Sequence, residues 1–398
     1  MKLALDGGIP ALELPLKTYV WIDPETVSLV TNLLSSQQLS GFLGQAGSQY
    51  LGGVWLKRLE NQIQNFGNHK FAIGFNSWTS GLEAIFVALG LPKNSEVIVP
   101  TWTMSATISA IVNSHLTPVF ADINENTFNI SPSDVLSKIT PNTSAICSVD
   151  LFGRPSPMIE LREIANRSNL RLITDSAQCP GGRINGVSPS KIADIGGYSF
   201  NRHKHIQSGE GGMVVTDDFV LADRLRAIRN HGEIAAPQVL INSESIYGHN
   251  WRLGEIESLI AFQQYQKVTD HLEYRRNVAQ KLLAELSKFE WLLFSESESS
   301  VVHDYYILGM RLHAKVNRDF VASSLQAEGI HFLITQYSGL EFLPAFSKFH
   351  KLPLTNAAHL NDFSFLGLYL AGFTFDDDTI DSITKAFEKT FTDPRAFN

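Results

Sequence analysis

The fold of this chain is decided by the segment SFNRHKHIQSGEGG, at residues 199–212. Short apolar runs that are typical of β-strands lie on both sides of it. Upstream, the run Arg171-Leu-Ile-Thr-Asp175 predicts a further strand that ends on a carboxylate. The segment therefore places one lysine, Lys204, between two strands. The glycines that follow it permit unusual backbone angles and the close approach of a ligand.

From about residue 70, short apolar runs alternate with segments of helical periodicity. Strands are predicted at 71–75, 96–100, 117–122, 144–150 and 170–174, and helices at 79–90, 105–114, 131–139 and 158–168. This alternation is typical of a mostly parallel sheet covered by helices. Ligands of such sheets bind outside the carboxyl ends of the strands. Ser77, Trp102 and Asp175 follow strand-like runs, so we expect them to share that rim.

The pattern changes in the second half of the chain. Residues 233–248 predict a long loop, and residues 255–289 predict one long helix that links two domains. A strand at 304–312 and helices at 316–328 and 378–389 predict a smaller α+β domain. We therefore expect a large domain at 1–254, which includes an N-terminal arm, and a small domain at 255–398.

Composition limits the functions that the chain can have. Of 398 residues, 44% are hydrophobic and 18% are charged, which is typical of a globular enzyme. The net charge of −8 and the lack of a basic run argue against nucleic-acid binding. Two cysteines, Cys147 and Cys179, without metal-ligand spacing, predict a reducing compartment and no metal site. We see no signal peptide and no apolar run of ~18 residues, so we expect a cytoplasmic protein without a membrane partner.

Lys204 and Asp175 together suggest a specific chemistry. Taken alone, Lys204 is typical of a surface loop and Asp175 of a helix cap or turn. Together, an amine that can form a Schiff base and a carboxylate that can hold a pyridine nitrogen protonated are the two groups that pyridoxal phosphate requires. Gln178 could donate to the ring oxygen. The segment 77–81, between a strand and a helix, and Ser199 offer donors for the phosphate.

These motifs resemble a known family. Asp175-x-x-Gln178 followed by Ser199-Phe-x-x-x-Lys204 and Gly-Glu-Gly-Gly212 resembles the sugar aminotransferases of the DegT/DnrJ/EryC1/StrS family, which are fold type I pyridoxal phosphate enzymes. The segments 96–100, 151–153, 229–232 and 248–252 agree in order. The resemblance covers roughly residues 20 to 345.

The resemblance implies a role for each matching residue. Lys204 would carry the Schiff base and move the proton, Asp175 would pair with the pyridinium nitrogen, and Gln178 would bind the ring oxygen. Thr79, Ser80 and Ser199 would hold the phosphate. Asn250 would reach the phosphate of the neighbouring subunit, which implies a homodimer with shared active sites.

Three positions depart from the family pattern. Trp78 stands where many members have glycine before the phosphate-binding residues. Trp102 and Met104 flank Thr103, so either could cover the cofactor ring. His203 and His205 surround the site, and one branch of the family replaces the lysine with histidine and acts as a dehydratase. Because Lys204 is retained, transamination is favoured.

The sequence therefore predicts an aminotransferase that moves an amino group from glutamate or glutamine to a keto sugar, expected to be nucleotide-linked. Three alternatives stay open, namely a cyclitol (inosose-type) aminotransferase, a sugar dehydratase and a non-catalytic regulator that binds pyridoxal phosphate. The candidate substrate residues are Phe42, Arg229, His231 and His303.

Overall fold

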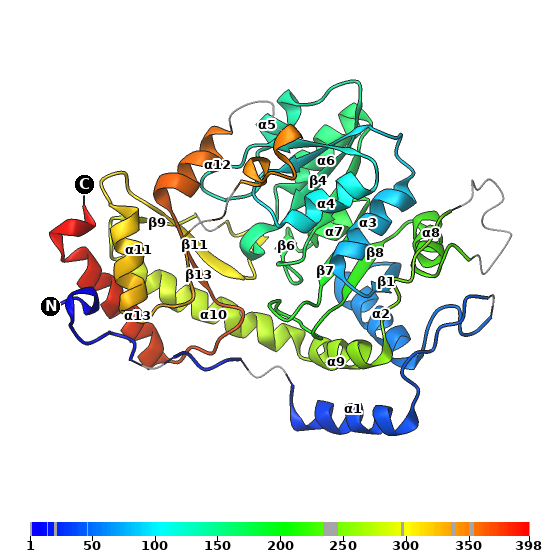
Figure 1. The fold of residues 1–398 in the computed structure, drawn as a ribbon, viewed down its shortest axis with the longest axis horizontal. Coiled ribbons are helices and arrows are strands. Elements are labelled where there is room, and N and C mark those ends of the chain that lie inside the picture. Colours follow the sequence, from blue (N-terminus) through cyan, green and yellow to red (C-terminus); the bar gives the residue numbers. More distant parts are fainter. Residues whose placement is uncertain are drawn as a thin grey trace.

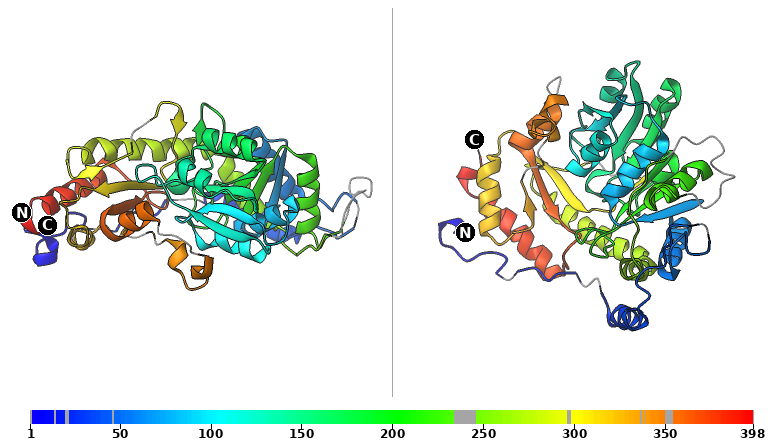
Figure 2. Two further views of the ribbon diagram at one scale, coloured as in Figure 1. Left: turned by 90° about the horizontal axis from the view of Figure 1, so that it is seen from above. Right: turned by 45° about the vertical axis from the view of Figure 1, so that its right-hand side comes forward.

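A computed structural model describes most of the chain. The described residues are 2–13, 15–19, 22–45, 47–233, 246–295, 298–335, 337, 339–349 and 354–397. Most of the loop predicted at 233–248 lies outside them. Within them, the chain forms a large sheet covered by helices and a small sheet at the other end of the molecule (Figures 1 and 2).

The large sheet has seven strands in the order β1-β8-β7-β5-β4-β2-β3. Its strands are β1 (Phe71–Phe75), β2 (Glu96–Pro100), β3 (Thr117–Ala121), β4 (Thr143–Val149), β5 (Arg171–Asp175), β7 (Ile195–Ser199) and β8 (Gly212–Thr216). All are parallel except β8, which pairs antiparallel with both β1 and β7. The predicted architecture of a mostly parallel sheet covered by helices is thus confirmed, and each strand predicted from 71 to 174 matches within one residue.

Helices cover both faces of this sheet. They are needed because the strands carry apolar side chains on both faces. One face carries α3 (Trp78–Leu89), α4 (Ser105–Asn113) and α8 (Phe219–Arg229). The other carries α2 (Val54–Gly67), α5 (Pro132–Ser137), α6 (Met158–Ser168), α7 (Pro189–Ile192) and α9 (Glu255–Gln266). α1 (Pro24–Ser36) lies against α9. A two-residue strand, β6 (Arg183–Ile184), pairs with β10 (Val301–Val302).

The small sheet is antiparallel, in the order β12-β13-β11-β9. It consists of β9 (Leu292–Leu293), β11 (Ile307–Leu312), β12 (Leu333–Ile334) and β13 (Phe365–Tyr369). A hydrophobic core joins it to α10 (Val268–Leu286), α11 (Arg318–Ala327) and α13 (Asp377–Phe391). We use the name small domain for this sheet and the helices and loops packed on it. The predicted division of the chain between residues 254 and 255 stays a prediction.

The structure corrects one prediction in this region and adds a finding. The helix predicted at 255–289 is two helices, because α9 ends at Gln266 and α10 begins at Val268. Lys267 between them has φ −110° and ψ 10°, outside the helical range. The β-branched Val268 and Thr269, followed by Asp270, favour a new first turn there. The N-terminal segment packs on the small domain, where Glu328 accepts from the N–H groups of Ala4 and Ala11.

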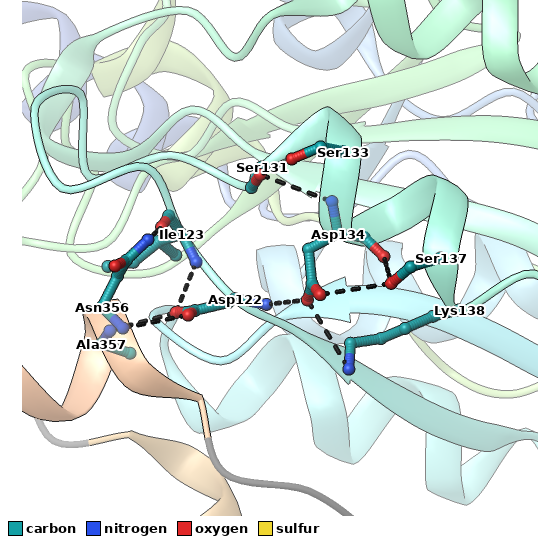
Figure 3. Close-up of polar contacts among 9 residues, drawn as sticks. All are labelled: Asp122, Ile123, Ser131, Ser133, Asp134, Ser137, Lys138, Asn356 and Ala357. Atoms are coloured by element: carbon teal, nitrogen blue, oxygen red, sulfur yellow. Dashed lines mark hydrogen bonds and ion pairs between the residues drawn. The ribbon is translucent and has the colours of Figure 1, made fainter.

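Hydrogen bonds connect the C-terminal part of the chain to the end of a strand of the large sheet (Figure 3). Asp122, just after β3, accepts hydrogen bonds from the backbone N–H groups of Asn356 and Ala357, both at 3.0 Å. These groups open α12 (Thr355–His359), so Asp122 caps a helix from another part of the chain. The Asp122 N–H in turn donates to the carboxylate of Asp134 in α5.

Candidate active site

A cavity of about 670 Å³ lies at the carboxyl ends of the parallel strands. Asp175 is the last residue of β5, Ser199 is the last residue of β7, and Trp78 opens α3 after β1. Lys204 lies in the loop between β7 and β8. The strands therefore bring these groups to one rim. Of the three residues expected at that rim, Ser77 and Asp175 line the cavity and Trp102 does not. The opposite wall belongs to the small domain and includes Tyr306, Ile307, Ile334, Tyr337 and Tyr369.

The Lys204 amine sits in surroundings that favour a neutral nucleophile. Burial is the main cause that lowers its pKa from 10.5 to about 8, and the charge of Asp175 opposes this shift. Its Nζ atom lies 4.9 Å from the centre of the Tyr306 ring. With this lowered pKa, a much larger fraction of the Lys204 amine is neutral near pH 7 than for an ordinary lysine, and the neutral amine can form a Schiff base with an aldehyde.

Asp175 is a buried carboxylate, 4% exposed, with well-defined partners. Its Oδ1 atom accepts from Trp78 Nε1 at 2.7 Å and from the Ala177 N–H at 3.1 Å. Its Oδ2 atom accepts from Thr107 Oγ1 at 2.9 Å. Burial raises the pKa of Asp175, while these donors and the charge of Lys204 oppose that rise. A cationic ring nitrogen beside this carboxylate would favour its ionised form.

Gln178 lines the same cavity with a fixed orientation. Its Oε1 atom accepts from the Phe152 N–H at 2.7 Å, so its amide nitrogen is the end that donates. That end hydrogen-bonds with Tyr337, whose pKa burial raises to about 12. Gln178 therefore presents a donor at the cavity, which is the property that its predicted role requires.

The N-terminus of α3 supplies donors at another part of the wall. Ser77 caps this helix by accepting from the Ser80 N–H at 3.1 Å, and Ser77, Trp78 and Thr79 line the cavity. The first N–H groups of a helix have no partner inside the helix and attract anions. Ser80 is buried, and its hydroxyl donates to Asn76 Oδ1 at 2.6 Å, so the structure does not bring it to the cavity.

A second strand end completes this wall. Ser199 lines the cavity, and its Oγ atom accepts from the Asn201 N–H at 3.3 Å. Gly212, on the adjacent strand β8, runs against the α3 N-terminus, since a Cβ atom there would lie 2.5 Å from the Trp78 backbone nitrogen. This contact explains one glycine of the motif at 209–212.

The structure distinguishes between Trp102 and Met104. Trp102 is fully buried behind the cavity and packs against Phe128, with 6.1 Å between ring centres and 11° between ring planes. Phe152, Tyr337 and Phe365 also surround it. Met104 is 62% exposed and lines the cavity. Met104, and not Trp102, therefore lies where it could cover a bound ring.

Five other residues predicted for the site lie outside this cavity. Arg229 is buried in an ion pair with Glu60 at 2.8 Å, and its guanidinium lies 4.9 Å from the Phe42 ring centre. Asn250 is exposed and accepts from Arg252 Nε. His231 is exposed, and its backbone N–H donates to the His249 carbonyl. His303 stacks on Tyr305 with 4.0 Å between ring centres and lines a different, smaller cavity.

Sequence reasoning missed several groups at this site. Thr107, on α4, lies four residues after Thr103, which precedes the helix, and their hydroxyls are in contact, so the pair of polar residues at this spacing is the signal that could have identified it. Tyr306, Tyr337 and Tyr369 come from separate segments of the small domain. No local pattern marks them, because only the tertiary fold brings them to the cavity.

The groups of this cavity fit pyridoxal phosphate. A buried amine can bond the aldehyde, a buried carboxylate can pair with the ring nitrogen, and a helix N-terminus can bind the phosphate. Among the described residues, no group of three or more side chains could hold a metal ion, and no helix has the length and apolarity needed to cross a membrane.

Comparisons with known proteins agree with this geometry. GDP-perosamine synthase of Vibrio cholerae is 29% identical over 304 residues, which cover 76% of this chain and 79% of that protein. UDP-N-acetyl-3-dehydro-alpha-D-glucosamine 3-aminotransferase of Acidithiobacillus ferrooxidans is 32% identical over 69% of this chain and 72% of that protein. The crystal structure of DesI with its TDP-sugar product has a TM-score of 0.85 and 28% identity, and the match covers 99% of this chain and 97% of DesI.

Fold and site together define a fold type I aminotransferase that depends on pyridoxal phosphate. Residues 43–383 match the DegT/DnrJ/EryC1/StrS aminotransferase family, and the chain belongs to this family.

Proposed function

We propose that this enzyme transfers an amino group from glutamate or glutamine to a nucleotide-linked keto sugar, in amino-sugar biosynthesis. The observation that carries this proposal is the meeting of Lys204, Asp175 and the α3 N-terminus in one cavity. The relatives support the substrate class, because their names refer to GDP-, UDP- and TDP-linked sugars.

Each group in the cavity has a proposed task. Pyridoxal phosphate, when bound, supplies an electron sink for the carbon that loses or gains the amino group. Lys204 Nζ holds the cofactor covalently and later moves the proton at that carbon, for which a pKa of about 8 suits it. Asp175 holds the ring nitrogen protonated, and Gln178 donates to the ring oxygen. Thr79, Ser199 and the α3 N-terminus bind the phosphate, with Ser80 supporting the Ser77 cap.

We also propose a homodimer in which each subunit completes the other's site. Phe42, Arg229 and Asn250 belong to one cluster, because Arg252 bonds Asn250 and both arginines lie over the Phe42 ring. His231 is close in the chain and exposed. None of these residues lines the cavity of its own subunit, which supports a role for Asn250, Phe42 and His231 in the partner's site. Arg229 would support this surface from beneath.

Mixing two inactive variants tests the shared site. Lys204→Ala and Asn250→Ala should each have little activity alone. In a mixed dimer, one of the two sites has both Lys204 and Asn250 intact, so activity should return after the variants are unfolded and refolded together. Mixtures that stay inactive while mixed dimers form would contradict the sharing of sites.

A direct substrate test uses 3-keto and 4-keto nucleotide sugars, with inosose as the cyclitol comparison. Glutamate and glutamine serve as donors, and product mass and 2-oxo acid release are measured. We expect an amino product from a nucleotide sugar. An amino product from inosose alone would replace the proposed substrate class, and loss of water without 2-oxo acid release would indicate a dehydratase. Cytoplasmic location stays a prediction, which the two buried, unpaired cysteines support.

A further inference from the structure

Trp78, the first residue of α3, contacts the buried carboxylate of Asp175. Its side chain is turned into the protein and is only 5% exposed. Its indole N–H donates to Asp175 Oδ1 at 2.7 Å, which is short for a hydrogen bond from nitrogen. Trp78 therefore links two parts of the site. It stands at the helix N-terminus proposed to bind the phosphate, and it donates to the Asp175 carboxylate proposed to bind the ring nitrogen.

The indole is held in a slot formed by glycines. A Cβ atom at Gly197, on β7, would lie 2.4 Å from Trp78 Cζ3, and a Cβ atom at Gly81 would lie 3.2 Å from Cε3. Gly212 passes the Trp78 backbone equally closely. Since β7 and the next turn of α3 carry no side chains at these points, the ring fits between them and has little freedom to rotate.

The donors around Asp175 account for most of its hydrogen-bonding capacity. A carboxylate has about four acceptor positions, two on each oxygen. Trp78 and Ala177 use both positions of Oδ1, and Thr107 uses one position of Oδ2. Because the Thr107 hydroxyl hydrogen goes to Asp175, Thr103 must be the donor in the Thr103–Thr107 contact at 2.9 Å. Among the described donors, one position on Oδ2 is left open.

We propose that Trp78 is a positioning residue that fixes the Asp175 carboxylate in its ionised form and leaves Oδ2 as the oxygen that receives the ring nitrogen of pyridoxal phosphate. This inference rests on the proposed roles of Lys204 and Asp175. Trp78 itself acts through Asp175 and touches no reacting atom. Among the described residues, the charged or titratable groups that interact with Asp175 are Lys204, Cys147 and Tyr337, and none of them replaces the indole donor.

Trp78→Phe tests the proposal, because it removes the N–H and keeps an aromatic ring in the slot. In the cofactor-free protein, the Asp175 carboxyl should titrate about one pH unit higher than in the wild type, since a donor to the charged form is lost. The 13C carboxyl resonance, assigned with Asp175→Asn, measures this. In the loaded enzyme, the 15N resonance of the labelled ring nitrogen should move toward the unprotonated position, because a more basic carboxylate takes a larger share of the proton.

Trp102→Phe is the matched control. Trp102 is equally buried in the same hydrophobic core, and no partner of its indole N–H is found among the described residues. This variant should leave both resonances at their wild-type positions. Equal resonances in Trp78→Phe and the wild type would overturn the proposal.

A comparison of the wild type with Asp175→Asn covers the case in which Trp78→Phe does not fold. The Trp78 indole N–H should exchange slowly with solvent, and its resonance should shift in Asp175→Asn while that of Trp102 does not. If the Trp78 indole N–H resonance has the same position in Asp175→Asn as in the wild type, the proposal is also overturned. If the wild-type enzyme shows no bond at Lys204 or an unprotonated ring nitrogen, the proposed site itself fails. If the wild type behaves as expected, only the role of Trp78 is at stake.

Discussion

The two walls of the cavity are built in different ways. The sheet wall carries Lys204, Asp175 and Gln178, which come from the ends of adjacent strands and the loops that follow them. The small-domain wall is mainly aromatic and comes from distant segments, such as Tyr306 and Tyr369, whose ring centres are 5.3 Å apart. Charged groups with fixed partners thus face a wall of tyrosine and isoleucine side chains. This difference suggests that the sheet wall holds the cofactor and that the other wall selects the substrate.

The two walls also meet at Lys204. Tyr369 Oη donates to the His203 carbonyl at 2.6 Å, directly before Lys204, and the Tyr306 ring faces the lysine amine. The small domain therefore supports the loop that carries Lys204. Changes in the sheet wall should stop the chemistry, while changes that loosen the small-domain wall should have weaker effects.

The largest effect is expected from Lys204→Ala. Without the amine, no covalent bond to pyridoxal phosphate can form, so borohydride treatment should fix no cofactor on the protein and turnover should fall below detection. Peptide mass spectrometry after reduction and digestion measures this. Lys281→Ala, at an exposed lysine on α10, should keep the adduct. An adduct found on another side chain in the wild-type protein would contradict the assignment.

Asp175→Asn should come next, with activity lower by about 10²–10³-fold, because the shape is kept while the charge that supports the ring nitrogen is lost. Single-turnover rates with the amino donor measure this. Asp150→Asn is the control, since Asp150 is also buried at a strand end but bonds Ser156 and Ser176 away from the cavity. Near-wild-type rates in Asp175→Asn would refute the pyridinium role.

A pH dependence should follow from the Lys204 amine. Only the neutral amine attacks an aldehyde, so capture of pyridoxal phosphate by the cofactor-free protein should speed up as pH rises toward about 8 and then level off. The charge of Asp175 raises the pKa of Lys204, so the plateau should begin at a lower pH in Asp175→Asn. Stopped-flow absorbance measures both profiles. A capture rate that keeps rising toward pH 10 would contradict the lowered pKa.

The smallest effect is expected from Asp122→Ala, which removes the acceptor for the first N–H groups of α12. The free energy of unfolding should fall by about 1–2 kcal/mol, while cofactor capture by Lys204 stays unchanged. Urea denaturation measures this, with Asp377→Ala at an exposed ion pair as the control. If Asp122→Ala lost cofactor capture as completely as Lys204→Ala, the expectation that only changes in the sheet wall stop the chemistry would be wrong.

The sequence predicted the sheet wall well for a physical reason. Alternating apolar runs locate the strands, and functional groups that follow parallel strands must meet at one edge. Asp175, Gln178 and Lys204 could therefore be placed together from local pattern and family resemblance. The same reasoning placed Trp102 on the rim, but aromatic packing with Phe128 holds it behind the cavity. Periodicity also could not detect the helix break at Lys267, because apolar residues continue on both sides of it.

By itself, then, the sequence determined the parallel sheet, the lysine between two of its strands and the class of chemistry, because short-range patterns encode strand ends and the residues attached to them. Only the tertiary structure decided which tyrosines face the lysine, that Met104 lies in the cavity, and that Trp78 donates to Asp175. Those contacts join segments that are far apart in the chain, and their geometry depends on packing, such as the glycine slot around the indole, which no local pattern specifies.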